Sequence, residues 1–293
     1  MFAADFDYYR AGSVAEAGQL LAQHPGAKLL AGGHSLIPLL KLRLAVPPAL
    51  IDIGRVAELR DIALEGGGLR IGALATHAEI ARSDAVREHA AALAEAAGQI
   101  GDPAVRNRGT IGGNVAHADP ASDLPAVLVA LGATLAVTGQ GGERSIDAGD
   151  FFTGVMMTSL GEDELLTSVR IPSAAGRGTA YVKFSHPASR YAVIGVAASV
   201  ALDAGPGESV CTDASVAIGG LVPGPVRCSA VEEALKGRAP SGEALAAAAA
   251  AVAQDLGGDL LGDVFASADY RGAVAPVYVE RAIAAAAGRA TQA

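Results

Sequence analysis

The spacing of apolar and polar residues predicts that helices alternate with strands along the whole chain. Ser13 and Glu16 have the spacing of a capping box, so we expect a helix from Ser13 to about His24, where Pro25-Gly26 ends it. Short apolar runs on either side of a glycine-rich segment predict strands at 28–30 and 50–53. The first fifty residues are therefore predicted to form a small α/β unit.

The pattern changes after Gly54. Apolar runs on both sides of a glycine triplet at 66–68 predict a hairpin, and Thr76 is placed to cap a helix. A helix with Pro125 in its first turn should begin at Ser122 or Asp123. The other elements expected here are an alanine-rich helix at 86–100 and strands at 133–137 and 165–171.

A small, polar, glycine-rich segment at 173–178 predicts a domain boundary. Beyond it, the pattern predicts strands at 180–184, 195–202 and 214–219, and helices at 230–235, 242–256 and 274–287. We therefore expect two domains, 1–175 and 178–287, the first divided into subdomains of about 1–54 and 55–175.

Composition narrows the class of protein. The chain has 293 residues, 51% of them hydrophobic but only 4% aromatic, so a large core must be built from Ala, Val, Leu and Ile. A net charge of −9 disfavours nucleic acid and anionic membranes as partners. The two cysteines, Cys211 and Cys228, are too few and too far apart to hold an iron–sulfur cluster. No secretory signal or transmembrane segment is apparent, which predicts a cytoplasmic protein.

Two glycine-rich segments stand out as candidate binding motifs. The first, Ala31-Gly32-Gly33-His34-Ser35, follows a predicted strand, and the second is Gly109-Thr110-Ile111-Gly112-Gly113-Asn114. Glycines let backbone amides approach a phosphate closely, and each segment adds a hydroxyl. Together they suggest a dinucleotide diphosphate held from two sides, whereas the first segment alone could be a tight turn without a ligand. The GxGxxG spacing of the doubly wound dinucleotide fold is absent.

Other polar residues near these segments leave several functions open. Asp123 could cap its helix or accept hydrogen bonds from a ribose or an adenine amino group. His34, His77 and His117 lack the spacing of a metal site, so no metal is expected. Ser35 lacks the closing glycine of a GxSxG nucleophile motif, which disfavours a serine hydrolase.

The two glycine segments resemble the FAD-binding motifs of the medium, flavin-binding subunit of molybdenum hydroxylases. The form Ala31-Gly32-Gly33-His34-Ser35-Leu36-Ile37-Pro38 is most similar to the aerobic carbon monoxide dehydrogenase branch, and xanthine dehydrogenase carries a similar domain. The similarity covers nearly the whole chain, including the Asp123 helix, Glu164-Leu165-Leu166 and Lys183-Phe184.

The resemblance implies an α+β protein with the FAD-binding fold of the vanillyl-alcohol-oxidase (PCMH) type. Two α/β subdomains would precede a smaller C-terminal flavoprotein domain of antiparallel sheet and helices, with noncovalent FAD between the domains. The FAD contacts that the resemblance implies are Leu29, Leu30, Ala31, Gly32, Gly33, His34, Ser35, Leu36, Ile100, Thr110, Ile111, Gly112, Gly113, Asn114, Asp123, Leu166, Lys183 and Tyr191.

The resemblance also implies particular roles for three of these residues. Asp123 would hold the ribose or adenine end of FAD, and Tyr191 would cover the isoalloxazine ring. Lys183 could stabilise the reduced, anionic flavin. The alternatives are an ordinary half-buried aromatic for Tyr191 and a solvated strand lysine for Lys183.

The function implied is electron transfer within an oxidoreductase, with the flavin rather than any side chain performing the chemistry. Electrons would arrive from the [2Fe-2S] clusters of a small partner subunit and leave to an external acceptor. A large molybdopterin subunit would choose the substrate, in a dimer of heterotrimers that could sit at the inner face of the membrane. The alternatives are a free-standing FAD-dependent oxidase of the same fold, with His34 where some oxidases attach FAD, and a scaffold that has lost FAD.

Overall fold

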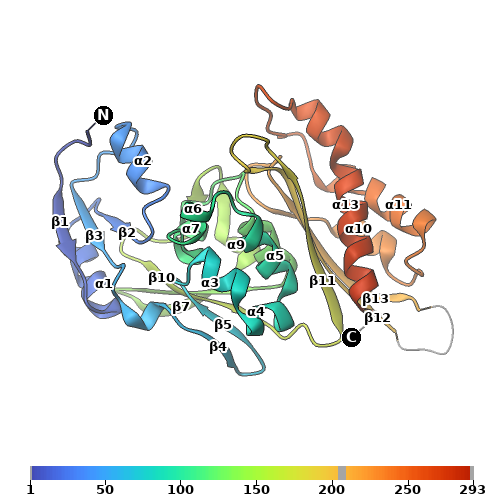
Figure 1. The fold of residues 1–293 in the computed structure, drawn as a ribbon, viewed down its shortest axis with the longest axis horizontal. Coiled ribbons are helices and arrows are strands. Elements are labelled where there is room, and N and C mark those ends of the chain that lie inside the picture. Colours follow the sequence, from blue (N-terminus) through green and yellow to red (C-terminus); the bar gives the residue numbers. More distant parts are fainter. Residues whose placement is uncertain (1, 204–208, 291–293) are drawn as a thin grey trace.

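Three sheets of at least three strands each follow one another along the chain in the computed structural model, which describes residues 2–203 and 209–290 (Figure 1). The first is a parallel sheet in the order β1-β3-β2, accompanied by two helices. The central strand β3 is buried because neighbours pair with both of its edges and α1 packs on it. The elements are β1 (Asp7–Arg10), α1 (Val14–Gln23), β2 (Lys28–Leu30), α2 (Leu36–Lys41) and β3 (Ala49–Asp52).

Helix α1 begins at the predicted cap. The Ser13 side chain accepts a hydrogen bond from the Glu16 amide at 3.1 Å. The Glu16 carboxylate reaches one residue further back than a capping box requires and accepts from the Gly12 amide at 2.7 Å. Two donors at the start of the helix are thus satisfied by Ser13 and Glu16, as the sequence predicted in outline.

The second sheet is antiparallel, in the order β4-β5-β10-β6-β7. Its strands are β4 (Ile62–Glu65), β5 (Gly68–Gly72), β6 (Thr134–Gly139), β7 (Gly142–Asp147) and β10 (Leu165–Ile171). Helices from the intervening chain pack on it and share one apolar core with it. They are α3 (His77–Arg82), α4 (Asp84–His89), α5 (Ala91–Gln99), α6 (Pro103–Arg106), α7 (Ile111–His117) and α8 (Leu124–Ala130). Short elements complete the unit: a 3₁₀ turn (Ala57–Leu59), α9 (Ala148–Phe151), β8 (Phe152–Gly154) and β9 (Met157–Thr158).

The third sheet, in the order β11-β12-β13-β14, is antiparallel and lies between two layers of helices. Tyr181, Ala197 and Ala217 face the core of the second unit, whereas Ala180, Val196 and their like-facing neighbours pack on the C-terminal helices. Both faces of β12 are therefore buried, which explains why its sequence is continuously apolar. The elements are β11 (Arg177–Ser185), β12 (Ala192–Leu202), β13 (Cys211–Gly219), β14 (Val226–Arg227), α10 (Ser229–Leu235), α11 (Gly242–Ala250), α12 (Val252–Asp255) and α13 (Ala268–Ala290).

Two predicted helices are each interrupted. The helix expected at 86–100 breaks at Ala90, whose φ of −151° is not helical and whose carbonyl accepts from Leu93 to start α5. The helix expected at 242–256 divides at Ala251 into α11 and α12. The last helix is longer than predicted and runs through Pro276.

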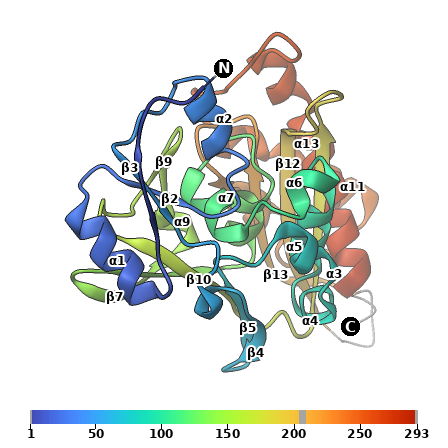
Figure 2. The ribbon, with the colours of Figure 1, turned by 60° about the vertical axis from the view of Figure 1, so that its left-hand side comes forward.

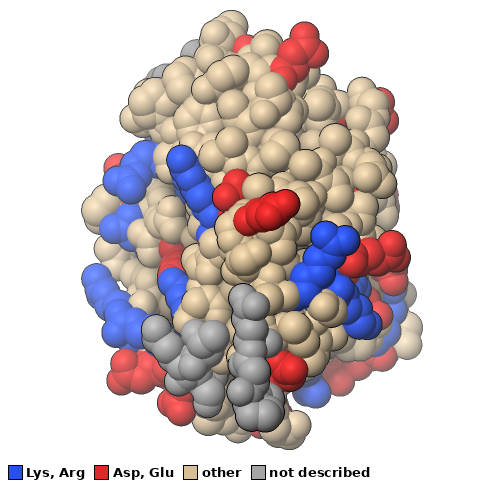
Figure 3. Space-filling view, turned by 90° about the vertical axis from the view of Figure 1, so that its right-hand side faces the viewer, with Lys and Arg blue, Asp and Glu red and all other residues tan. Residues whose placement is uncertain are grey.

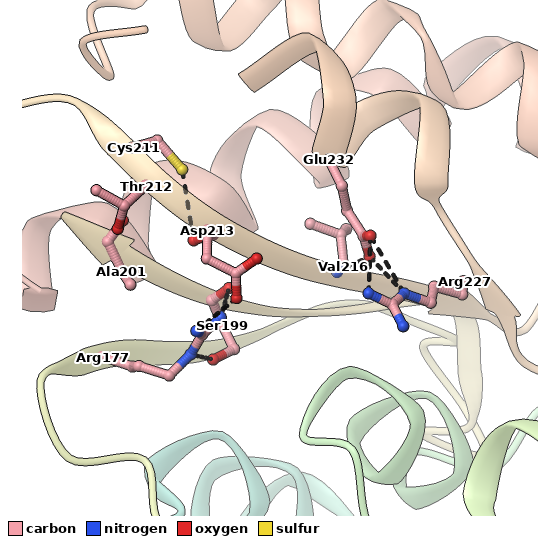
Figure 4. A network of polar contacts seen from close by, with 9 residues as sticks. All are labelled: Arg177, Ser199, Ala201, Cys211, Thr212, Asp213, Val216, Arg227 and Glu232. Carbon is pink, nitrogen blue, oxygen red and sulfur yellow. Dashed lines mark hydrogen bonds and ion pairs between the residues drawn. The ribbon is translucent and has the colours of Figure 1, made fainter. Parts of the chain in front are cut away.

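Side-chain hydrogen bonds tie the third sheet together (Figure 4). Arg177 on β11 pairs with Asp213 on β13 at 2.7 Å and donates to the Ser199 hydroxyl on β12 at 2.8 Å. Strand β14 is too short to cover the whole edge of β13, so the Glu232 carboxylate on α10 accepts from the Val216 amide at 2.9 Å. The Glu232 contact thereby connects α10 to the edge of the sheet.

The outer face of the C-terminal domain carries acidic and basic side chains side by side (Figure 3). Among the helices of the described residues, none is long and apolar enough to cross a membrane.

Candidate functional site

A cleft of about 830 Å³ is lined by residues from all three units. The first unit contributes most residues of 27–36, the second most of 109–114 and alternate residues of 156–166, and the third the turn at 188–191. Helix α7 stands between the first sheet and the third in both ribbon views (Figures 1 and 2). A cavity of this size falls in the range of sites for small molecules and cofactors.

The two glycine segments meet in this cleft. A Cβ on Gly32 would lie 2.1 Å from the carbonyl oxygen of Arg108, so only glycine lets the first segment pass so close to the second. Gly109, at the start of the second segment, lies at the same contact. The sequence interpretation that both segments serve one site is therefore consistent with their contact in space.

The first segment presents free backbone donors. Within the described residues, the amides of Gly32, Gly33, His34 and Ser35 find no hydrogen-bond acceptor. Consecutive amides of this kind form a concave nest that binds anions. This segment thus has the donors that a diphosphate requires.

The second segment differs from the sequence-based interpretation. It is the first turn of helix α7, and its amides are already used: those of Ile111 and Gly112 donate to Ala75 and Ala73 at 3.0 and 2.8 Å. The Gly113 amide donates to the Thr110 hydroxyl at 3.1 Å. Of its two helical glycines, Gly112 is buried against Ala73, and Gly113 is exposed, so this segment offers the cleft an exposed position without a side chain.

Asn114, directly after Gly113, supplies a polar group to the cleft. Its side-chain oxygen accepts from the Ser122 hydroxyl at 2.7 Å, which leaves the amide nitrogen free to donate. Both residues line the cleft. The contribution of the second segment is therefore shape and one side-chain donor rather than backbone amides.

Asp123 lies in the wall of the cleft and occupies the N-cap position of α8, where the sequence predicts that the helix begins, but its side chain makes no capping hydrogen bond. Its carboxylate accepts from the Tyr181 hydroxyl at 2.6 Å and forms an ion pair with Lys183 at 2.7 Å. The residue is only 4% exposed, and this burial raises the pKa of its carboxyl, against the opposing effect of the Lys183 ammonium. The capping interpretation is therefore wrong, because these two side chains engage the carboxylate instead.

The Lys183 side chain is fully buried behind Asp123 and does not line the cleft. The alternative of a solvated strand lysine is therefore wrong. Leu30 and Ile111 also lie outside the lining. The other residues expected to contact FAD all line the cleft: Leu29, Ala31, Gly32, Gly33, His34, Ser35, Leu36, Ile100, Thr110, Gly112, Gly113, Asn114, Asp123, Leu166 and Tyr191.

An apolar wall and one aromatic ring bound the opposite part of the cleft. Ile100 and Leu166 are almost fully buried beneath it, while Tyr191 is 47% exposed. Burial, together with the nearby carboxylates of Asp119 and Asp123, raises the pKa of the Tyr191 phenol. Tyr191 is therefore a neutral, half-exposed ring in the lining of the cleft.

Sequence reasoning missed several lining residues. His77, considered only as a metal ligand, lines the cleft at 3% exposure, and burial with the nearby His34 lowers its pKa to about 4. Arg190, which enters the cleft wall at a positive φ of 61°, precedes Tyr191 directly, and that adjacency was the only signal for it. Within 2–203 and 209–290, no cluster of His, Cys, Asp or Glu is arranged to hold a metal.

The three-unit fold places a run of free backbone amides in a cleft between the units, where they can bind an anionic group. Residues 4–174 match the family described as the FAD binding domain in molybdopterin dehydrogenase. Residues 179–286 match the carbon monoxide dehydrogenase flavoprotein C-terminal domain. The chain belongs to this family of FAD-binding subunits of molybdenum hydroxylases, which confirms the predicted resemblance and fold class.

Relatives of known name match over nearly their full length. The chain is 41% identical to the carbon monoxide dehydrogenase medium chain of Hydrogenophaga pseudoflava, covering 97% of this chain and 98% of that one. It is 37% identical to the nicotine 6-hydroxylase medium subunit of Paenarthrobacter nicotinovorans, covering 96% and 97%.

Solved structures agree with this assignment. Carbon monoxide dehydrogenase from Hydrogenophaga pseudoflava superposes with a TM-score of 0.92 at 41% identity and 99% coverage of both chains. Quinoline 2-oxidoreductase from Pseudomonas putida 86 gives 0.92 at 32% identity, again with 99% coverage of both chains.

Proposed function

We propose that this chain binds FAD noncovalently in the cleft and acts as the electron-transfer subunit of a molybdenum-containing dehydrogenase. The observation that carries the proposal is the run of free amides at Gly32–Ser35, held against the second glycine segment where a Cβ would not fit. Backbone donors without acceptors inside the protein are costly unless water or a ligand satisfies them. A diphosphate group fits that donor set.

Each group of lining residues has a role in this proposal. The amides of Gly32–Ser35 and the side-chain amide of Asn114 would hold the diphosphate. Asp123 would accept from a hydroxyl or amino group of FAD, and Tyr191 would cover the isoalloxazine ring. Bound FAD supplies the ability to collect two electrons and release them singly or in pairs.

Lys183 would act on the flavin through Asp123 and not by contact. Its ammonium compensates the charge of the Asp123 carboxylate at 2.7 Å and lies outside the cleft. The sequence predicted that Lys183 acts on the flavin directly. In this proposal Asp123 contacts FAD, and Lys183 contacts Asp123.

The electrons would come from iron–sulfur clusters. These clusters would belong to a partner subunit, because this chain has too few cysteines to hold one. Cys211 and Cys228 are its two cysteines, and both are fully buried in the C-terminal domain. We infer a small [2Fe-2S] subunit, a large molybdopterin subunit and an external electron acceptor, assembled in the cytoplasm as a dimer of heterotrimers. The names of the relatives differ in substrate but agree on a medium chain or subunit, so the large partner would set the substrate.

The proposal is tested by a gentle affinity purification of the tagged chain from its own host, with FAD, iron and molybdenum quantified. The expected result is one FAD per chain, with a large and a small subunit and both metals in fixed ratio. A lone yellow protein that reduces its own flavin with an organic substrate would instead identify a free-standing oxidase, for which His34 in the cleft would be the candidate attachment site. A colourless protein without partners would contradict both functions.

A further inference from the structure

We propose that Tyr181 is a positioning residue for the flavin site, acting by fixing the Asp123 carboxylate in the wall of the cleft. The inference rests on the proposed binding of FAD in that cleft. Tyr181 itself is fully buried and does not line the cleft, so any effect it has on FAD must pass through another residue.

Tyr181 and Lys183 reach Asp123 from the same side of one strand. They are two positions apart on β11, so their side chains leave the same face of the third sheet. The Tyr181 hydroxyl donates to one carboxylate oxygen at 2.6 Å, and the Lys183 ammonium contacts both oxygens at 2.7 and 2.9 Å. Two side chains of the C-terminal domain thus bind an acidic residue that belongs to the second unit.

The neighbouring strand is shaped to admit the tyrosine hydroxyl. A Cβ on Gly195 of β12 would lie 2.4 Å from the Tyr181 hydroxyl oxygen, so the hydroxyl occupies the space that any other residue would fill. The Tyr181 amide is also fixed, because it donates to the Glu95 carboxylate on α5 at 2.9 Å. Tyr181 is therefore held at its backbone and confined at its hydroxyl.

This confinement determines what the Asp123 carboxylate presents to the cleft. A carboxylate has about four acceptor positions, of which Tyr181 and Lys183 occupy three. Lys183 alone could follow the carboxylate as it rotates, because an ammonium is a flexible point charge. The short phenolic hydrogen bond defines one orientation, and the remaining acceptor position would be available to a hydroxyl or amino group of FAD.

The test is a double-mutant cycle on FAD affinity, measured by flavin fluorescence with the full apoprotein. Tyr181→Phe should weaken binding about fivefold, the effect of one hydrogen bond of ordinary strength. The same substitution in an Asp123→Leu/Lys183→Met background, which replaces the buried ion pair by apolar side chains, should have no further effect on FAD affinity. Tyr278→Phe is the matched control, because that ring stacks on Phe184 and its hydroxyl has no partner among the described residues.

A second variant displaces the hydroxyl without removing it. Gly195→Ala should weaken FAD binding in the same direction as Tyr181→Phe and change the visible circular dichroism of the bound flavin, whereas Tyr278→Phe should change neither. If Tyr181→Phe lowers the unfolding midpoint but leaves the FAD affinity at the wild-type value, the role is structural and the proposal is overturned. An equal loss of affinity in both backgrounds would also overturn it. If the unsubstituted chain binds no FAD, the proposed function fails together with this inference.

Discussion

Gly32 decides whether the two glycine-rich segments of the cleft can touch. We expect Gly32→Ala to weaken FAD binding at least tenfold, because the new methyl group would overlap the Arg108 carbonyl and force the segments apart. Overpacking of this kind typically costs about 1–3 kcal/mol of folding stability as well. Titration of the apoprotein with FAD, together with urea unfolding, measures both effects.

Gly149→Ala is the matched control for that substitution. Gly149 lies in helix α9 with open space around the position of a Cβ, so alanine should leave FAD affinity unchanged. Equal affinities for Gly32→Ala and Gly149→Ala would show that the two segments do not form one binding site.

His77 should make the stability of the chain depend on pH between about 4 and 6.5. Burial lowers the pKa of its imidazole to about 4 from an ordinary 6.5, so in this interval only the unfolded chain takes up the proton. The stabilisation is complete above pH 6.5 and is lost as the pH falls toward 4. At 1.36 kcal/mol per pKa unit, the loss is about 3 kcal/mol.

Urea unfolding at several pH values measures this contribution. His77→Gln, which carries no charge at any pH, should flatten the pH dependence of the unfolding free energy over that interval. His89→Gln removes a partly exposed histidine elsewhere in the same unit and should keep the wild-type dependence. An unchanged slope for His77→Gln would refute the assignment.

At the scale of elements, the sequence predicted those that local signals define. The cap of α1 at Ser13 and the cap of α3 at Thr76 are both present, since an N-cap depends only on neighbouring residues. Strand β7 was missed because it lies at a sheet edge and most of its residues are polar and exposed, which leaves no alternating pattern. The alanine-rich helix was predicted as one piece because nothing local marks the break at Ala90.

The candidate site shows the same division between local and long-range information. The glycine segments were visible in the sequence, but their contact at Gly32 and Arg108 depends on how two sheets pack. The helical state of the second segment was missed because glycines are poor helix formers, and the Thr110 cap and packing on Ala73 override that preference. The Asp123 side chain bonds to Tyr181 of β11 instead of capping its own helix. This contact could not be predicted from one segment alone.

Glu95 on α5 links three elements, so it should contribute more to the free energy of unfolding than a surface ion pair does. One carboxylate oxygen accepts the Tyr181 amide of β11 at 2.9 Å, and the other pairs with Arg289 of α13. We expect Glu95→Ala to lower the free energy of unfolding by about 1–3 kcal/mol, because it leaves a partly buried amide without an acceptor. Glu65→Ala, which removes an exposed pair with Arg70 at 3.8 Å, should cost less than about 1 kcal/mol. Similar unfolding free energies for the two variants would contradict the role of Glu95.

At the scale of the whole molecule, the cleft is built where three separately cored units meet. Each unit has its own buried apolar cluster, and the cluster of the second unit extends into the third through Tyr181, Ala197 and Ala217. The cluster of the first unit likewise takes in residues of the second, namely Val56, Leu59, Leu74 and Leu165. A ligand in the cleft therefore contacts all three units.

FAD should for this reason stabilise the whole chain as one cooperative unit. A ligand that binds only the folded state adds about 2.7 kcal/mol at a concentration one hundred times its dissociation constant. If the diphosphate nest at Gly32–Ser35 and the ring site at Tyr191 belong to one cofactor, FAD should raise the unfolding midpoint of the apoprotein more than FMN and ADP added together. FMN and ADP would each engage part of the cleft and each lose their translational and rotational freedom separately, whereas the intact dinucleotide loses this freedom once. Thermal unfolding of the apoprotein with each ligand at equal concentration makes the comparison, and a midpoint with FAD no higher than with ADP alone would mean that the flavin half is not held by this cleft.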